Sequence, residues 1–433
     1  MCLQRDSVNH IYGFANFASK VAIKINNKIY YGYVDENYCF HVYLPMFNAG
    51  GPYKMEIITD VGRKIINDVY IGEVYLCAGQ SNMEMTLSQC GEIMANYYNN
   101  SNVNNDKIRL LKMDYNPQYT PTASFKGNIN WVGANQYSVK SFSAVAYVFG
   151  KQLQEKLDCP VGLILSCKSG SILEHWLSEK TYEDICKIYN PVTNTSTNQL
   201  TPCLGYNGMF YPLKGYTMRG AIWYQGCANA YGTENYYLFG LQALVNQCRE
   251  DFNNENFTFT VCQLARYQEN PLAYSIINEN INSLAKIEEK IAVARNLDLG
   301  EWYDIHPKEK STLAIRAANE TLRLFYNENI KAPIYIESYA FNEDNSVTIV
   351  LSEDVILKNN ANGFEIFDGK SFRTDMQVSS HKNIITIKTT YPIRSIRYGY
   401  VCKMTDEIIQ DVSKMVSVYD NSGMPLDLFQ ITK

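Results

Sequence analysis

One segment of the sequence places a serine where an apolar strand pattern ends. In residues 72–85 the apolar run stops at Gly79 and Gln80, and Ser81 follows directly. Open α/β sheets bind ligands at the carboxyl ends of their strands. A helix expected just after Ser81 would leave backbone N–H groups beside the hydroxyl, and such groups stabilise an oxyanion. Ser81 is therefore a candidate nucleophile, although serine is also a common helix N-cap.

A second segment, residues 301–308, offers a base and a carboxylate two positions apart. Asp304 and His306 stand in an expected loop, and Pro307 is close to the first turn of a following helix. A serine nucleophile needs a base of near-neutral pKa, and that base needs a carboxylate to fix its tautomer. The same pair could ligate a metal, but no third or fourth ligand is grouped with it. The pattern thus favours a triad with Ser81.

Two further strand ends offer hydrogen-bond donors. The run 219–230 breaks after Gln225 and presents Asn229, whose side-chain amide could stabilise an oxyanion by about 3 to 4 kcal/mol. The run 160–176 passes into Gly170, where a backbone N–H could approach a ligand closely. Either residue could equally serve only as a turn. At one edge of one sheet, the four strand ends would supply a nucleophile, a base, a carboxylate and three donors.

The elements that would position these residues have the pattern of a parallel sheet covered by helices. Between residues 71 and 326, short runs that are apolar on both faces alternate with stretches of helical period. Apolar stripes over 145–157 and 238–248 predict two core-facing helices. The predicted strands are 73–78, 108–113, 161–166, 221–225, 257–264 and 291–297.

Outside this block the apolar period changes to two, which is typical of β-structure with one buried face. The change is seen in residues 21–25 and again in 334–387. We therefore predict three parts, namely an N-terminal β-region (1–70), a catalytic domain (71–328) and a C-terminal β-domain (329–433).

Composition limits the classes of partner. The 433 residues carry a net charge of −5 with scattered Lys and Arg, so no nucleic-acid partner is expected. No apolar run predicts a membrane span or a secretory signal, which favours a cytoplasmic location unless the N-terminus is incomplete. The twelve cysteines are dispersed, and we predict buried free thiols and no zinc site. Oligomeric state is not predicted.

Taken together, these segments resemble the sialate O-acetylesterase family of SGNH hydrolases. The resemblance implies a flavodoxin-like three-layer α/β/α SGNH hydrolase domain with accessory β-sandwich regions. The motifs that carry it are GQSNMEM at 79–85, WYQG at 223–226 with Asn229 and Ala230, DIHP at 304–307, and the segments 48–53, 205–213 and 419–426.

The resemblance implies removal of acetyl groups from a sugar through an acyl-enzyme. Ser81 would attack the acetyl carbonyl, His306 would take its proton, and Asp304 would orient His306. The oxyanion hole would consist of the Ser81 and Gly170 backbone amides with the Asn229 side chain.

Three further residues lie in or near these motifs and are predicted to contact the substrate, namely Gln80, Gln225 and Trp176. The expected partner is a glycan that carries O-acetyl groups, and no metal or organic cofactor is implied. The family's usual substrates are O-acetylated sialic acids, while relatives act on acetylated plant polysaccharides.

Two departures from the family pattern leave alternatives open. Lys168 and Ser169 stand where the family usually has Trp-Gly, and Cys227 and Ala228 replace a carboxylate and a hydroxyl. The first change alters the expected pocket wall. The alternatives are a xylan-type acetylesterase and a carbohydrate-binding relative that has lost catalysis.

Overall fold

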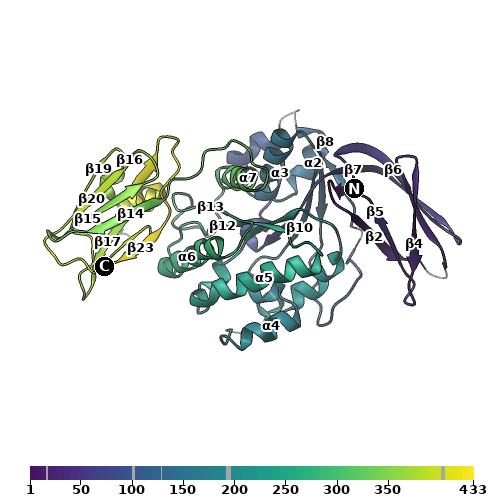
Figure 1. Ribbon diagram of the computed structural model, residues 1–433, viewed down its shortest axis with the longest axis horizontal. Coiled ribbons are helices and arrows are strands. Elements are labelled where there is room, and N and C mark those ends of the chain that lie inside the picture. Colours follow the sequence, from purple (N-terminus) through teal and green to yellow (C-terminus); the bar gives the residue numbers. More distant parts are fainter. Residues whose placement is uncertain (16–17, 100–102, 128, 192–196, 401–404) are drawn as a thin grey trace. The chain divides into compact units, whose positions relative to one another are not determined.

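The computed structural model describes residues 1–15, 18–99, 103–127, 129–191, 197–400 and 405–433 (Figure 1). The chain forms two compact units, and neither is one continuous stretch. Unit 1 comprises Met1–Gln225 and Gly240–Thr260, and unit 2 comprises Gly226–Phe239 and Val261–Lys433.

Unit 1 contains a parallel sheet of buried strands. The central strand β7 (Arg63–Gly79) lies between β10 (Val161–Cys167) and β11 (Gly220–Tyr224). Beyond β10 follow β8 (Asn105–Lys112), also parallel, and the short antiparallel β9 (Val132–Ala134). The register pairs Gly79 with both Cys167 and Tyr224. Three neighbouring strands therefore end at one level, at the same edge of the sheet.

Helices cover both faces of these strands, which gives three layers. Figure 1 shows α2 and α3 on one face and α4 and α5 on the other. The Ser143 hydroxyl caps α3 by accepting from the Ala146 N–H. Gly150 lets α3 approach β10 closely, because a Cβ there would lie 2.5 Å from a Leu163 methyl. The helices are α1 (Ser81–Glu84), α2 (Gln136–Lys140), α3 (Ala144–Leu157), α4 (Glu179–Cys186) and α5 (Tyr237–Asp251).

The N-terminal strands continue from the first half of β7. There β1 pairs with β7 in parallel and β6 pairs with it antiparallel, and the order then runs β6-β3-β4-β5-β2. Alternate residues of β3 enter the core of this sheet, as its period of two predicts. The bounds are β1 (Cys2–Gln4), β2 (Asn9–Phe14), β3 (Val21–Ile25), β4 (Lys28–Val34), β5 (Cys39–Leu44) and β6 (Gly50–Thr59).

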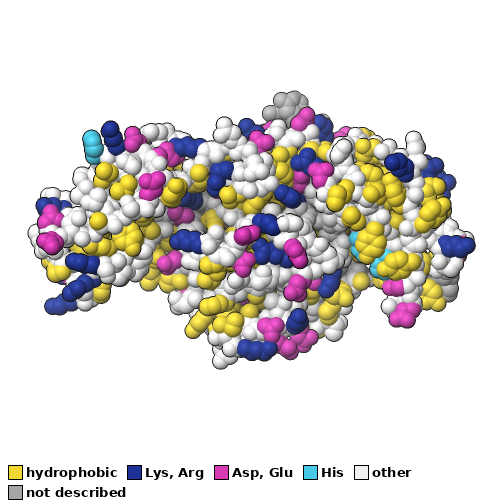
Figure 2. Space-filling model, viewed as in Figure 1, with side chains coloured by type: hydrophobic (Ala, Val, Ile, Leu, Met, Phe, Trp, Pro, Cys, Tyr) yellow, Lys and Arg dark blue, Asp and Glu magenta, His cyan; other side chains and the backbone are white. Residues whose placement is uncertain are grey.

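The outer face of this N-terminal sheet is aromatic. His41 of β5 stacks on Tyr33 of β4 at 5.1 Å, and His10 of β2 stacks on Tyr43 at 4.6 Å. Figure 2 shows hydrophobic and histidine side chains side by side over these strands. His10 also stacks on His41 at 5.2 Å, so these four rings form one stacked cluster.

Unit 2 begins with an α/β part. Its strand β13 (Ile291–Ala294) is contacted by α6 (Pro271–Ile287) and α7 (Ser311–Phe325). The strand β12 (Thr258–Cys262) begins in unit 1 and ends in unit 2. The Gln263 N–H donates to the Ala294 carbonyl at 3.0 Å, which joins the ends of β12 and β13.

The C-terminal part of unit 2 consists of antiparallel sheets around one apolar core. Two four-stranded sheets have the orders β14-β15-β20-β19 and β18-β17-β21-β23, and β16 pairs with β22. The elements are β14 (Ile336–Phe341), β15 (Ser346–Leu351), β16 (Val355–Leu357), β17 (Phe364–Phe367), β18 (Phe372–Arg373), β19 (Gln377–His381), β20 (Ile384–Lys388), β21 (Ser395–Tyr398), α8 (Asp406–Gln410), β22 (Val418–Asp420) and β23 (Phe429–Thr432).

These elements confirm the predicted α/β fold with additional antiparallel sheets, and each predicted strand of the central block is present. The largest difference is at β7, which begins at Arg63 and not at residue 73, because its first half pairs with β6. The division into three domains stays a prediction. Within the described residues, no helix has the length and apolar character needed to cross a membrane.

Candidate functional site

The turn that presents Ser81 depends on a glycine. Gly79 ends β7 with φ +136°, and a Cβ there would lie 2.2 Å from the Tyr224 carbonyl oxygen of the neighbouring strand. The Gln80 N–H then donates to that same carbonyl at 3.0 Å. Ser81 is therefore held at the edge of the sheet, where α1 begins.

Two backbone N–H groups near this turn have no acceptor in the described part of the chain, those of Ser81 and Gly170. Gly170 follows β10, whose last residue pairs with Gly79, and has φ +74°. The loop before it is tied to the turn twice: the Lys168 N–H donates to the Gly79 carbonyl at 3.1 Å, and the Ser169 N–H donates to the Glu84 carboxylate at 2.6 Å. Two unpaired donors are thus fixed by the same turn.

The loop around Gly170 is supported by buried side chains. The Gln225 amide donates to the Ser171 carbonyl at 3.0 Å, and the Trp176 indole N–H donates to the Ser171 hydroxyl at 3.0 Å. Trp176 is 0% exposed and packs on Phe210 and Trp223. The ring is fully buried in this structure, and a sugar contact by Trp176 stays a prediction. Its indole N–H bond to Ser171 supports the loop.

Gln225 is also fully buried, and Gln80 is 3% exposed. The Gln225 amide donates to the Ser171 carbonyl oxygen, so Gln225 supports the same loop. A sugar contact by Gln80 stays a prediction.

The substituted positions have structural partners. The Lys168 ammonium lies 4.7 Å from the centre of the Tyr115 ring, a cation–π distance. Cys227 is buried in the short turn Cys227–Asn229. Both departures from the family pattern are therefore accommodated by packing.

In unit 2, Asn229 lies in a short turn that begins at a glycine. Gly226 has φ +142°, and a Cβ there would lie 3.0 Å from Ile277. The Asn229 amide donates to the Thr233 hydroxyl at 3.0 Å and is 3% exposed.

Unit 2 also contains Asp304 and His306. The His306 backbone N–H donates to Asp304 Oδ1 at 2.8 Å, while the imidazole Nδ1 lies 3.9 Å from the same oxygen, beyond hydrogen-bond reach. Asp304 Oδ2 also lies 3.5 Å from the Lys308 ammonium. Both side chains are more than a third exposed. The carboxylate orders the loop and stands beside the imidazole.

The surroundings of His306 favour its neutral form. Partial burial lowers the pKa of the imidazole from its usual 6.5, and the ammonium of Lys310 lowers it further. Asp304 opposes this effect, and Lys308 adds to it. A neutral imidazole has the lone pair that a general base needs at pH 7.

The loop that carries Asp304 and His306 is anchored by residues that show no functional signal in the sequence. The Arg316 guanidinium of α7 pairs with Asp298 at 2.6 and 2.9 Å, and both side chains are less than a tenth exposed. Arg266 donates to the Leu297 carbonyl at 3.3 Å. An Asp and an Arg eighteen positions apart carry no local pattern, so only the fold shows that they are paired.

Within the described residues, His, Cys, Asp and Glu side chains form no group of three or more that could hold a metal ion. Unit 1 brings Ser81, Gly170 and Gln225 to one edge of one sheet, and unit 2 holds Asn229, Asp304 and His306. The triad itself stays a prediction.

The comparisons identify the family. The family model described as carbohydrate esterase, sialic acid-specific acetylesterase, matches residues 71–321, more than half of the chain. Sialate O-acetylesterase of Mus musculus is 24% identical over 339 residues, 64% of this chain and 61% of the relative. The Homo sapiens protein of the same name is 27% identical over 229 residues, 49% of this chain and 42% of the relative. The chain thus spans about half the length of the curated relatives it matches.

A solved structure supports the fold. The crystal structure of a carbohydrate acetylesterase from Xanthomonas citri aligns with 100% of this chain and 97% of its own, with a TM-score of 0.87 at 22% identity. That likeness establishes a shared fold. With the family model covering both the serine turn and the Asp-x-His loop, this chain belongs to the carbohydrate esterase family of sialic acid-specific acetylesterases.

Proposed function

We propose that the chain is a serine-dependent carbohydrate O-acetylesterase that removes acetyl groups from sialic acid or a related sugar. The observation that carries the proposal is the pair of unpaired N–H groups at Ser81 and Gly170, fixed beside a serine at the end of β7. Such donors stabilise the oxyanion of acyl transfer. Membership of an esterase family supports the same chemistry.

In the first half of the proposed reaction, the Ser81 oxygen attacks the acetyl carbonyl carbon while His306 accepts the hydroxyl proton. The Ser81 and Gly170 N–H groups, with the Asn229 amide, stabilise the negative oxygen of the tetrahedral intermediate. The bond from the carbonyl carbon to the sugar oxygen then breaks, and His306 returns the proton to that oxygen. The products are the free sugar hydroxyl and an acetyl ester on Ser81.

In the second half, a water molecule attacks the acetyl ester and gives a proton to His306. Collapse of the second tetrahedral intermediate returns that proton to Ser81 and releases acetic acid, which loses its remaining proton to the solvent to become acetate. Asp304 stabilises the positively charged imidazole in both halves. This stabilisation requires the 3.9 Å distance between His306 Nδ1 and Asp304 Oδ1 to shorten when substrate binds.

The test is acetate release from 9-O-acetylated sialic acid and from an aryl acetate. We expect Ser81→Ala to lower both rates about 10⁴-fold or more, since the nucleophile is lost. Ser124→Ala, at an exposed serine of the same unit, is the matched control and should keep the wild-type rates. Activity that survives Ser81→Ala would contradict the proposal.

Acetylated xylan is the discriminating substrate. A sialate esterase should release acetate faster from the sialic acid than from xylan at equal acetyl concentration. The reverse order would assign the chain to the xylan-type alternative. No acetate from any substrate, with the sugar still bound, would favour the non-catalytic relative.

A further inference from the structure

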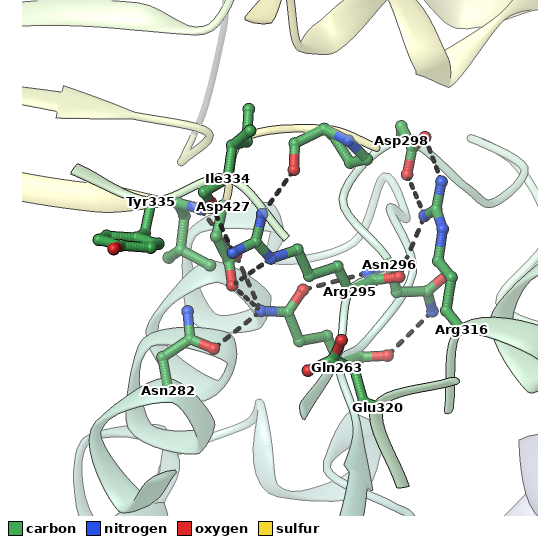
Figure 3. Close-up of polar contacts among 12 residues, drawn as sticks. Gln263, Asn282, Arg295, Asn296, Asp298, Arg316, Glu320, Ile334, Tyr335 and Asp427 are labelled. Carbon is green, nitrogen blue, oxygen red and sulfur yellow. Dashed lines mark hydrogen bonds and ion pairs between the residues drawn. The ribbon is translucent and has the colours of Figure 1, made fainter. Parts of the chain in front are cut away.

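Unit 2 contains a cavity of about 620 Å³ that includes none of the predicted catalytic residues. It lies along the edge strand β13, and α6, α7 and the segments 332–336 and 426–429 complete its wall. Figure 3 shows polar contacts of several residues that line it, among them Asn282, Arg295 and Asp427. This cavity is large enough for a monosaccharide and has no part in the proposed reaction.

Hydrogen bonds hold the wall of the cavity in place. The Arg295 guanidinium donates to the carbonyl oxygens of Pro425 and Ile334, each at 2.8 Å (Figure 3). The Gln263 amide donates to Asn282 Oδ1 at 3.0 Å and to Asp427 at 2.9 Å. The segments that form the cavity are therefore joined before any ligand arrives, which lowers the entropy that binding would cost.

Four donor groups that line the cavity have no partner in the described part of the chain. They come from α6, α7 and the segment before β14. Asn282 and Arg323 use their other side-chain polar atoms in hydrogen bonds. The groups are Asn282 Nδ2, Lys286 Nζ, Arg323 Nη1 and the Tyr335 hydroxyl.

The acceptors of the cavity, by contrast, are occupied. Glu320 accepts from Arg323 at 2.6 Å, and Asp427 accepts from Gln263 and from the Leu428 N–H. Three cationic side chains and two carboxylates line the cavity, so its net charge is +1 in a chain of net charge −5. A ligand that enters here finds free donors and positive charge, which suits a carboxylate.

The ring of Tyr335 adds a flat apolar surface. Tyr335 lines the cavity and is 56% exposed, and Figure 3 shows it on the same side of the view as Asn282. The C–H face of a sugar ring packs on such an aromatic surface, while its hydroxyl groups reach donors at the rim. Donors for an anion and a surface for a pyranose thus occur in one cavity.

We propose that this cavity binds a carboxylate-bearing sugar unit, such as a sialic or uronic acid, through Lys286 and Asn282 with the ring against Tyr335. The inference rests on the proposed function in one respect, since it takes a glycan as the substrate. The bound unit would belong to the same glycan as the acetylated sugar, and the cavity would tether that glycan to the enzyme.

The test is calorimetric titration of the full chain with N-acetylneuraminic acid and with its methyl ester, which keeps the ring and lacks the charge. We expect the acid to bind and the ester not to bind. Lys286→Met should weaken binding of the acid at least tenfold. Tyr335→Ala should weaken it as well. The matched controls are Lys370→Met and Tyr339→Ala, at exposed side chains of the same unit that do not line the cavity.

Asn282→Asp provides a second variant if Lys286→Met does not fold. It keeps the oxygen that accepts from Gln263 and replaces the free donor with a negative oxygen, so binding of the acid should be lost. Equal binding of the acid and the ester, or wild-type binding by both variants, would overturn the proposal. Equal displacement by inorganic phosphate would also overturn it, because a general anion site does not select a sugar.

This titration does not depend on turnover. Failure of the proposed function would appear as acetate release that survives Ser81→Ala. If the cavity does not bind the sugar, the affinity for N-acetylneuraminic acid will be the same in the cavity variants as in the wild type, whatever the rate of acetate release.

Discussion

His306 and His175 have the same ordinary pKa and very different surroundings. His306 is partly exposed in a loop, with Asp304 and two lysines close to it. His175 is fully buried, and its Nδ1 lies 2.8 Å from the Thr201 carbonyl oxygen. Burial lowers the pKa of His175 to about 4. One histidine can therefore act as a base near neutral pH, while the other stays neutral inside the fold.

The surroundings of His306 predict how activity depends on pH. Its lowered pKa keeps the base form at pH 7, and kcat/KM should fall as the pH drops through that pKa. Lys308→Gln removes a cation that opposes the imidazolium and ends the contact with Asp304. We therefore expect the acid limb of the kcat/KM profile for an aryl acetate to move to higher pH. Lys370→Gln should leave the profile in place, and an unmoved limb in Lys308→Gln would contradict the role of His306.

His175 predicts a loss of stability in acid. Between pH 6.5 and about 4 the unfolded chain protonates this histidine and the folded chain does not, so stability falls as the pH drops through that window. The effect is worth about 2 to 3 kcal/mol at pH 4.5. Urea unfolding at pH 7 and 4.5 should show a smaller acid loss for His175→Asn than for the wild type. The exposed His381→Asn serves as the control, and a wild-type loss in His175→Asn would refute the prediction.

At the scale of elements, the loop before α7 depends on one buried ion pair. Asp298→Ala leaves the Arg316 guanidinium buried without its carboxylate, which costs about 3 to 5 kcal/mol. We expect urea unfolding to show that loss, together with a lower rate of acetate release because the His306 loop loses its anchor. Asp344→Ala breaks an exposed pair with Lys388 and should leave both quantities unchanged. Equal effects of the two variants would show that the buried pair is not an anchor.

The end of β7 makes a second prediction at this scale. Gly79→Ala puts a Cβ 2.2 Å from a backbone oxygen at a positive φ, so neither the turn nor the neighbouring strand can accept it. We expect a loss of at least about 3 kcal/mol in unfolding free energy, or no soluble protein. Gly62→Ala, with no atom within 4 Å of its Cβ, is the matched control and should melt like the wild type. A stable Gly79→Ala would mean that the turn can rearrange.

The same elements show how much of the fold could be predicted from the sequence. Strands such as β10 and β11 were predictable because every residue in them is buried, which leaves an unbroken apolar run. The first half of β7 was missed because its exposed residues obscure the pattern. Ser81 and Gly170 could be placed at one edge because parallel strands end there. The burial of Trp176 could not be predicted, since it depends on Phe210 and Trp223 packing from distant segments.

For the whole molecule, burial predicts the behaviour of the cysteines. Eight of the eleven described cysteines are buried and three are partly exposed. Burial raises the pKa of the Cys159 thiol to about 11, which suppresses the reactive thiolate. At least eight of the twelve thiols should therefore fail to react with an aryl disulfide at pH 8 in the native protein, and all twelve should react in guanidinium. Rapid native labelling of more than four would contradict this burial.

The two units also differ from domains joined by a single linker. The chain passes from one to the other after Gln225, after Phe239 and again after Thr260. One cut of the chain can therefore leave at most one of the two units whole, and that unit stays attached to a segment of the other. Any fragment that begins at Val261 lacks the turn with Asn229, and any fragment that ends at Gln225 lacks most of α5. The coding sequence therefore cannot be divided at one point into two parts that each encode a complete unit.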